Sequence, residues 1–414
     1  MLYKEICIRD DLFDEDFEIN NENLTELKLR CFNQDYEAMY LLAKYYLKNK
    51  DSIEDISVII KLLEKASDNG IVRAATLLGN VYKYGCKDDY LPNDEDITKA
   101  ITWYKKAVEQ NDPIAMYELA LIYLTAHDDD RLKATEGFEL ALNSAEQGYN
   151  LAQYLMGLLY LEGYHVPYNN VEALSWLEKA ADNNCVDSLV LLGRLYFQGN
   201  EVEQDYDKAF LYSKKAADLN SAEGMFSLGR CYDEGIGVEH DPYEAFKWLN
   251  KAAELGNVNA IFIVGNHYEK GDGCKQSYSK AIEYYNLLAE SGYPSAITHL
   301  GYLYHVGRGV KKDLKKAFKL FNDASKLNDE EATHFLYICY RDGLGVDKDE
   351  KKALKYLKKA AKLDCPESLF ELALAYFQGN YGLKINENKC IDCLIRAAEL
   401  GLKEAEDILE ELKK

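Results

Sequence analysis

Small and apolar residues recur along this chain with a period of about 36, and each period contains two helical patterns. If the first small residue of each block is taken as an anchor, a small residue usually returns five positions later and a tyrosine eight positions later. Offsets of zero, four, five and eight fall on one side of a helix, so they predict the buried side of a first helix. The anchors are Ala38, Ala74, Ala115, Ala152, Ser188, Gly224, Ala260, Ala296, Ala332 and Ser368.

A second helical pattern follows the first in each period, with the form Lys-Ala-x-x-Trp/Tyr-Leu-x-Lys-Ala-Ala. It is clear at residues 99–107, 172–181 and 208–217, and it ends in Gly or Asn, which adopt the left-handed backbone conformation at low cost. Glycine inside a helix costs about 1 kcal/mol relative to alanine. Its recurrence five residues after the anchor therefore predicts close approach of the second helix to the first.

Four G-x-G sequences lie between the two helices of successive periods, at residues 235–237, 271–273, 307–309 and 343–345. A glycine-rich phosphate-binding loop follows a strand and opens a helix. These sequences instead follow a helix and recur in register with the repeat, so they predict turns.

The combination of A-x-x-x-L-G-x-x-Y-x-x-G-x-G-V, a short polar loop and K-A-x-x-W-Y/L-x-K-A-A-x-x-G resembles the Sel-1-like repeat family, relatives of the tetratricopeptide repeats. The best matches are residues 224–256 and 296–328, and the resemblance covers roughly residues 35–414. It implies an all-α fold, a right-handed α-solenoid superhelix of about ten antiparallel helix pairs in one elongated domain. We expect an N-terminal extension or cap at residues 1–34, ten repeats at 35–401 and a capping helix at 402–414.

Members of this family act mostly as adaptors, so the resemblance implies a non-enzymatic scaffold that binds a protein or peptide in its concave groove. One alternative is a bacterial virulence or immunity protein whose acidic surface neutralises a toxin or engages a host protein. Another is a peptidoglycan-related or small-molecule hydrolase or binder, which would need export and a catalytic carboxylate or serine. The sequence shows no nucleophile paired with a base and no cofactor fingerprint, so we predict no catalytic or cofactor-binding residues.

The net charge of −22 argues against a nucleic-acid partner, because neutralising phosphates requires a basic face. Residues 301–364 depart from this, with 15 Lys/Arg against 10 Asp/Glu. That stretch either orients an approaching partner or forms solvated outer helix faces. No apolar run is long enough for a signal peptide or a membrane span, so we expect a cytoplasmic protein without direct membrane insertion.

The ten cysteines and seven histidines offer few candidate ligands. Cys390 and Cys393 form the one C-x-x-C and align with packing positions of other repeats, which favours reduced core thiols over a redox or metal pair. The chain lacks the regular cysteine pairs of the secreted, disulfide-bonded branch of the family. Only His305 and His334 could both face the groove, and their separation by one repeat predicts no metal site.

The resemblance places the first helices on the concave side, and helical geometry puts offsets of two, six and nine from the anchor on their free face. We call these side chains the first-helix stripe. Two alternatives to a partner would also cover the stripe. Its side chains could pack against the next repeat, or the N-terminal segment could fold back into the groove through Leu12, Phe13, Phe17 and Ile19. Arg194 and Arg230 are the predicted contacts to a ligand carboxylate, with ion pairs to Asp233 or Glu234 as the alternative. The predicted partner-binding residues are Tyr117, Leu121, Leu124, Tyr154, Leu158, Leu161, Arg194, Phe197, Phe226, Arg230, Phe262 and Asn266.

Overall fold

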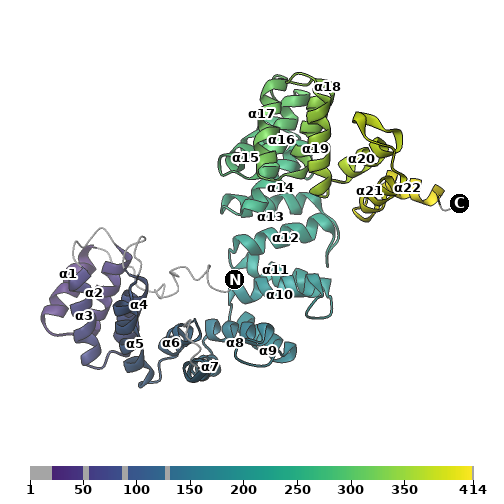
Figure 1. Cartoon of the computed structure of the whole chain (residues 1–414). Helices are drawn as coiled ribbons and strands as arrows, with labels where there is room; N and C mark the ends of the chain where they lie inside the picture. Colours follow the sequence, from purple (N-terminus) through teal and green to yellow (C-terminus); the bar gives the residue numbers. More distant parts are fainter. Residues whose placement is uncertain (1–20, 50–55, 86–91, 126–130, 413–414) are drawn as a thin grey trace. The chain divides into compact units, whose positions relative to one another are not determined.

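The computed structural model describes residues 21–49, 56–85, 92–125 and 131–412, and throughout these ranges the regular structure is helical (Figure 1). The described helices are α1 (Asn21–Phe32), α2 (Tyr36–Lys48), α3 (Ile56–Asp68), α4 (Val72–Tyr84), α5 (Asp94–Val108), α6 (Pro113–Thr125), α7 (Arg131–Glu146), α8 (Asn150–Glu162), α9 (Asn170–Asp182), α10 (Val186–Gln198), α11 (Tyr206–Asp218), α12 (Ala222–Glu234), α13 (Pro242–Glu254), α14 (Val258–Lys270), α15 (Tyr278–Glu290), α16 (Pro294–Val306), α17 (Leu314–Lys326), α18 (Glu330–Asp342), α19 (Glu350–Lys362), α20 (Pro366–Gln378), the 3₁₀ turn η3 (Asn380–Gly382), α21 (Glu387–Glu399) and α22 (Lys403–Leu412).

Backbone contacts divide the chain into two compact units, where the sequence predicts a single elongated domain. Unit 1 comprises Met1–Leu195 with Asn200–Glu203, and unit 2 comprises Tyr196–Gly199 with Gln204–Lys414. Within each unit a first helix pairs with the second helix that follows it, as in α6 with α7 and α16 with α17. The second helix also packs against the next first helix, as in α13 with α14. The predicted all-α array of helix pairs is confirmed.

The recurring glycine of the first helix allows the second helix to come close, as the sequence predicts. A Cβ atom added to Gly301 would lie 2.7 Å from Cε1 of Phe321, and one added to Gly265 would lie 2.6 Å from Cε1 of Tyr285. Phe321 and Tyr285 are fully buried. Each glycine therefore provides the space that an aromatic ring from α17 or α15 occupies.

The tyrosine eight residues after the anchor packs under the lysine of the Lys-Ala pair. In one repeat Lys316 Nζ lies 4.0 Å from the ring centroid of Tyr304 and donates to its hydroxyl at 2.7 Å. Lys280 lies over Tyr268 in the same way, at 4.7 Å. Cation–π contact and ring burial thus explain why both residues recur, and they make these tyrosines packing residues.

Polar residues begin and end the second helices at fixed positions. Asp313 caps α17 by accepting a hydrogen bond from the backbone N–H of Lys316 at 2.9 Å. After the helices, Asn328 and Gly256 take left-handed φ values of 64° and 85°, which confirms the predicted helix ends. The four G-x-G sequences form turns, as predicted.

The two ends of the array are covered by helices. Leu27 of α1 is buried against Ala38 and Leu42 of α2, and Ala405 of α22 is buried against the last repeat. The alternative in which Leu12, Phe13, Phe17 and Ile19 fill the groove lies outside the described residues.

Candidate functional site

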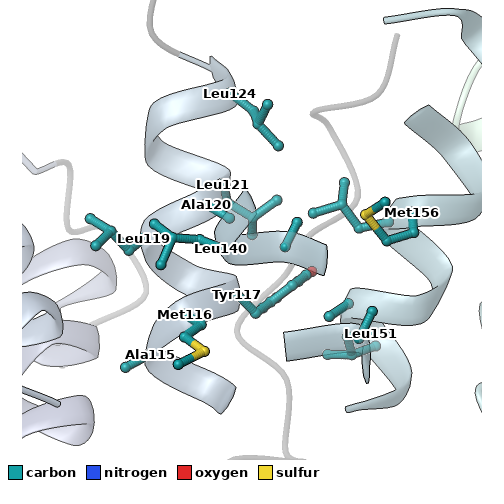
Figure 2. Packing of buried hydrophobic residues seen from close by; sticks show 14 of the residues in the cluster. Ala115, Met116, Tyr117, Leu119, Ala120, Leu121, Leu124, Leu140, Leu151 and Met156 are labelled. Atoms are coloured by element: carbon teal, nitrogen blue, oxygen red, sulfur yellow. The ribbon is translucent and has the colours of Figure 1, made fainter. Parts of the chain in front are cut away.

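The first-helix stripe is buried in the third repeat, on α6. Tyr117, Leu121 and Leu124 are only 6%, 5% and 2% exposed. Figure 2 shows Tyr117 on the side of α6 where Leu151 and Met156 lie, and its ring lies 5.3 Å from the ring of Tyr149. The expectation that solvent reaches these three side chains is wrong. Tyr117 fits the alternative of packing against the next repeat, whereas Leu124 lies against α7 of its own repeat, where a Cβ on Gly137 would be 3.1 Å from its Cγ. The cause is that α6 is apolar on nearly every side, as expected for a helix enclosed by its neighbours.

The stripe becomes more accessible in the repeats that follow. Tyr154, Leu158 and Leu161 on α8 are half-buried, and Arg194 on α10 is exposed. Arg194 forms no ion pair with any residue within the described ranges. It is therefore a cation in an acidic protein that a ligand carboxylate can reach.

Arg230 on α12 is already engaged within unit 2. Its Nε donates to Glu234 Oε1 at 2.8 Å, and its guanidinium lies 5.5 Å from the ring centroid of Phe197. The ion pair with Glu234 is the alternative expected from the sequence. Arg194 lies in unit 1 and Arg230 in unit 2. Phe226, also on α12, is half-buried against the core of its repeat.

A hydrogen-bonded aromatic cluster occupies the stripe at α14. The Tyr285 hydroxyl lies 2.5 Å from Asn266 Oδ1 and 2.9 Å from Glu269 Oε2. His299 Nδ1 lies 3.3 Å from the same Glu269 oxygen, and the His299 ring lies 5.3 Å from the ring of Phe262. Asn266 and Phe262 are thus held in fixed positions by neighbours from α15 and α16.

The electrostatics of this cluster keep Glu269 ionised. Burial alone would raise the pKa of Glu269, but hydrogen bonds from His299 and Tyr285 and the nearby Arg308 lower it overall. A partly buried carboxylate with its donors already in place is a rigid acceptor. It can orient a polar group of a ligand without first rearranging.

A second cluster joins α18 to α20 and η3. The Tyr337 hydroxyl lies 3.1 Å from the Tyr381 hydroxyl. Arg341 Nη1 lies 3.3 Å from the Tyr337 hydroxyl and 3.8 Å from Glu371 Oε1. Phe377, at the end of α20, is 61% exposed. Exposed aromatic rings are enriched at protein-binding surfaces.

The candidate metal and redox residues have different surroundings. His305 packs against Phe321 and Phe335, whereas His334 Nδ1 bonds to Ser368 Oγ at 2.7 Å. Burial lowers the pKa of both histidines. Cys390 and Cys393 are free, and burial raises the pKa of both thiols, so the reactive thiolate form is disfavoured.

Two features of α14 are missing from the sequence-based prediction. The bonds of Glu269 to Tyr285 and His299 join three helices, and nothing in the one-helix pattern indicates them. His267 occupies an offset of seven, where neighbouring repeats carry Cys231, Leu303 and Cys339. A histidine where neighbouring repeats carry an apolar or thiol side chain is a signal that the sequence does contain, and it indicates a buried polar group.

A comparison with family models matches the Sel1 repeat along nearly the whole chain, at residues 37–71, 72–112, 113–149, 150–185, 186–221, 222–257, 258–293, 294–329, 336–365 and 366–402. Sel1 repeat proteins generally bind protein partners. Among the described residues, no helix has the length and hydropathy needed to cross a membrane.

Individual relatives agree with this match. The chain is similar to the crystal structure of c5321, a protective antigen present in uropathogenic Escherichia coli strains that displays an SLR fold, with a TM-score of 0.74 and 29% identity over 95% of this chain and 82% of that one. A Sel1 repeat protein from Oxalobacter formigenes gives a TM-score of 0.59 and 27% identity over 75% of this chain and 90% of that one. The chitin synthase regulator SKT5 of Saccharomyces cerevisiae is 32% identical over 152 residues, which are 35% of this chain and 21% of that protein. The matched segment is thus about a fifth of the length of that curated relative.

Proposed function

This chain belongs to the Sel1 repeat family, and from that premise we propose that it is a non-enzymatic scaffold that binds a protein or peptide along the first-helix stripe of unit 2. The family is typically non-enzymatic and binds protein partners. The observation that carries the proposal is the row of half-buried aromatic and charged side chains on the first helices α12, α14, α18 and α20. Such residues supply most of the binding energy in protein interfaces.

The hydrogen bonds within this stripe support the proposal because they reduce the entropy lost on binding. Asn266 and Glu269 are held by Tyr285, and Arg341 is held by Tyr337 and Glu371. Side chains that are already ordered lose less rotamer freedom when a partner arrives. A ligand with apolar groups would lie against Phe262 and Phe377, with its polar groups bound by these fixed neighbours.

Arg194 and Arg230 are proposed separately as contacts to ligand carboxylates. Arg194 is exposed and can pair with a carboxylate at once. Arg230 must first break its ion pair with Glu234. This costs little because both side chains are more than a third exposed, at 37% and 43%. A carboxylate is therefore expected to gain more from pairing with Arg194 than with Arg230.

A second candidate function is that of a virulence or immunity protein that captures a basic toxin or host protein. The likeness to a protective antigen of uropathogenic Escherichia coli favours it, as does the net charge of −22. The two proposals differ in their dependence on salt. Capture of a basic protein by an acidic surface weakens steeply with ionic strength, whereas binding through aromatic side chains does not.

We also propose that the protein acts in the cytoplasm. Its cysteines include free thiols such as Cys231 and Cys339, both buried on first helices. Burial raises the pKa of Cys231 to about 11 and that of Cys339 to about 12. Thiols in this state suit a reducing compartment.

Peptide selection by display on the purified chain, followed by calorimetry of the selected peptides, tests the binding proposal. Phe377→Ala should weaken the peptides at least about tenfold, or about 1.4 kcal/mol. Tyr243→Ala is the matched control, because Tyr243 is 67% exposed but lies on the second helix α13. Equal effects of the two variants would contradict binding along the first-helix stripe.

The carboxylate contact has its own pair of variants. Arg194→Glu should weaken an acidic peptide about tenfold, whereas Lys214→Glu, on the exposed side of the second helix α11, makes the same charge change away from the stripe. If both reversals weaken binding equally, long-range charge rather than contact with Arg194 is responsible.

A further inference from the structure

The strongest unexplained feature of unit 2 is the buried imidazole of His267. It is 4% exposed and lies in the last turn of α14, seven residues after the anchor Ala260. At the same offset the neighbouring repeats carry the buried residues Cys231, Leu303 and Cys339. An apolar side chain therefore satisfies the packing of this position, and packing alone does not account for a histidine.

Hydrogen bonding fixes which nitrogen of His267 carries the proton. Nδ1 lies 3.0 Å from the backbone carbonyl oxygen of Asp272, and a carbonyl oxygen only accepts, so Nδ1 donates. In the neutral ring the lone pair is then on Nε2. This nitrogen lies 3.6 Å from Asp233 Oδ1, beyond hydrogen-bond distance, and it has no closer polar partner among the described residues.

Two carboxylates lie close to this imidazole. Asp233 comes from the last turn of α12, and Asp272 lies in the Gly271–Gly273 turn that follows α14. One ligand atom from each of Asp233, His267 and Asp272 lies within 4.8 Å of the others. The turn packs closely against the start of α13, since a Cβ on Gly273 would overlap the carbonyl of Pro242.

We propose that Asp233, His267 and Asp272 form a binding site for a divalent transition-metal ion, with Zn²⁺ as the best fit. A histidine that donates through one nitrogen to a carbonyl and has the other facing a carboxylate has the orientation of a metal ligand. Tetrahedral Zn²⁺ with bonds of about 2.0–2.1 Å separates its ligands by about 3.3–3.4 Å. The pair Asp233–His267, at 3.6 Å, nearly has this spacing, and the exposed Asp272 carboxylate, within 4.8 Å of both, would have to move closer.

The charge and the neighbouring repeats support this assignment. Two carboxylates and a neutral imidazole balance the double charge of Zn²⁺ and leave a fourth position for water. The equivalent positions one repeat later are Glu269, Leu303 and Arg308, which include a cation and an apolar side chain in place of two ligands. The three donors thus come together in this pair of repeats, where a bound ion would join α12 to α14. This proposal does not rest on the proposed partner-binding function, but the two share Asp233, which lies at offset nine of the first-helix stripe on α12.

Titration of metal-stripped full-length protein with ZnCl₂ in a calorimeter tests the site. We expect one Zn²⁺ per chain with a Kd below about 10 µM, and a Tm raised by about 5 °C or more at saturating Zn²⁺. His267→Leu restores the residue type of the neighbouring repeats and should fold, while Asp233→Asn keeps the side-chain shape. Both should weaken binding at least tenfold, whereas His240→Gln, which removes an exposed histidine, should not.

Three results would overturn the proposal. The first is the absence of Zn²⁺ binding to the wild-type chain at 100 µM, about ten times the expected Kd. The second is unchanged binding to both His267→Leu and Asp233→Asn. The third is a nuclear magnetic resonance titration that finds His267 as an imidazolium paired with Asp233 at pH 7 in the presence of Zn²⁺.

Discussion

The stripe on α6 in unit 1 and the stripe on α14 in unit 2 occupy the same offsets of the same repeat but have opposite properties. Tyr117, Leu121 and Leu124 are buried, whereas Phe262 and Asn266 are half-exposed and held by polar neighbours. Repeat register alone therefore does not determine whether a position faces solvent. The composition of the whole helix does, because α6 is apolar around its circumference and α14 is not.

The two units also differ in where they place charge. In unit 1 the only charged residue of α6, Glu118, is buried and bonded to Lys83 at 2.7 Å and to the Tyr84 hydroxyl at 2.8 Å. In unit 2 Arg230 and Glu234 form an ion pair at the surface. The charge on α6 of unit 1 thus serves internal structure, whereas the ion pair on α12 of unit 2 lies where a partner can reach it.

Truncating the side chain at offset nine to alanine should show the largest difference in stability loss between the two units. Leu124→Ala removes a side chain that is 2% exposed and should destabilise unit 1 by about 2–5 kcal/mol. Phe377→Ala, at the same offset on α20, should change stability by no more than about 0.5 kcal/mol. Urea unfolding followed by tryptophan fluorescence measures both, with Trp103 and Trp176 reporting unit 1 and Trp248 reporting unit 2. Similar losses for the two variants would remove the distinction between the stripes.

Breaking the Lys83–Glu118 pair of unit 1 and the Arg230–Glu234 pair of unit 2 should give the next largest difference in stability loss. Lys83→Met leaves Glu118 buried with no counter-ion, and we expect a loss of about 3 kcal/mol. Arg230→Met breaks an exposed pair and should cost less than about 1 kcal/mol. The same unfolding experiment applies, and a loss at Arg230 as large as that at Lys83 would show that the unit 2 pair is structural.

Removing the hydroxyl of Tyr285 should sharpen the description of the α14 cluster. Tyr285→Phe deletes the donor to Glu269 and Asn266 and should cost about 1 kcal/mol. The pKa of Glu269 should rise, because one of the hydrogen bonds that lower it is lost. Carboxyl resonances followed through a pH titration measure this, with Tyr243→Phe as the control. An unchanged pKa would mean that His299 and Arg308 hold the carboxylate without help from Tyr285.

Acidification should destabilise unit 2 slightly through His334 and His305. Burial lowers the pKa of both histidines in the folded state. Near and below pH 6.5 the unfolded chain therefore binds more protons than the folded chain, and the free energy of unfolding decreases as the pH is lowered. The Tm of unit 2 should therefore drop between pH 7.5 and pH 5.5, and His334→Gln should reduce the drop. A Tm that rises over this range in the wild type, or an identical slope in the variant, contradicts this assignment.

The repeat pattern predicts most of the fold, because it states which positions two adjacent helices must share. The glycine at Gly301, the tyrosine at Tyr304 and the cap at Asn328 each follow from local geometry that every repeat obeys. The accessibility of the stripe depends on contacts between repeats and on whole-helix composition. For that reason the pattern places Leu124 at the surface when it is in the core.

The candidate site depends on residues that the repeat does not specify. The contacts of Glu269 with Tyr285 and His299 bring together three helices, and no single-helix spacing indicates them. The trio around His267 combines the ends of two helices with a turn. In the sequence it is visible only as a histidine at an offset that neighbouring repeats fill with Leu or Cys.

Hydrogen–deuterium exchange of the chain with and without a display-selected peptide tests most directly whether unit 2 binds through its first helices. We predict that the peptide slows exchange in α12, α14, α18 and α20 and leaves α6 and the second helices α13 and α15 unchanged. Protection confined to second helices, or to unit 1, would contradict binding along the first-helix stripe of unit 2.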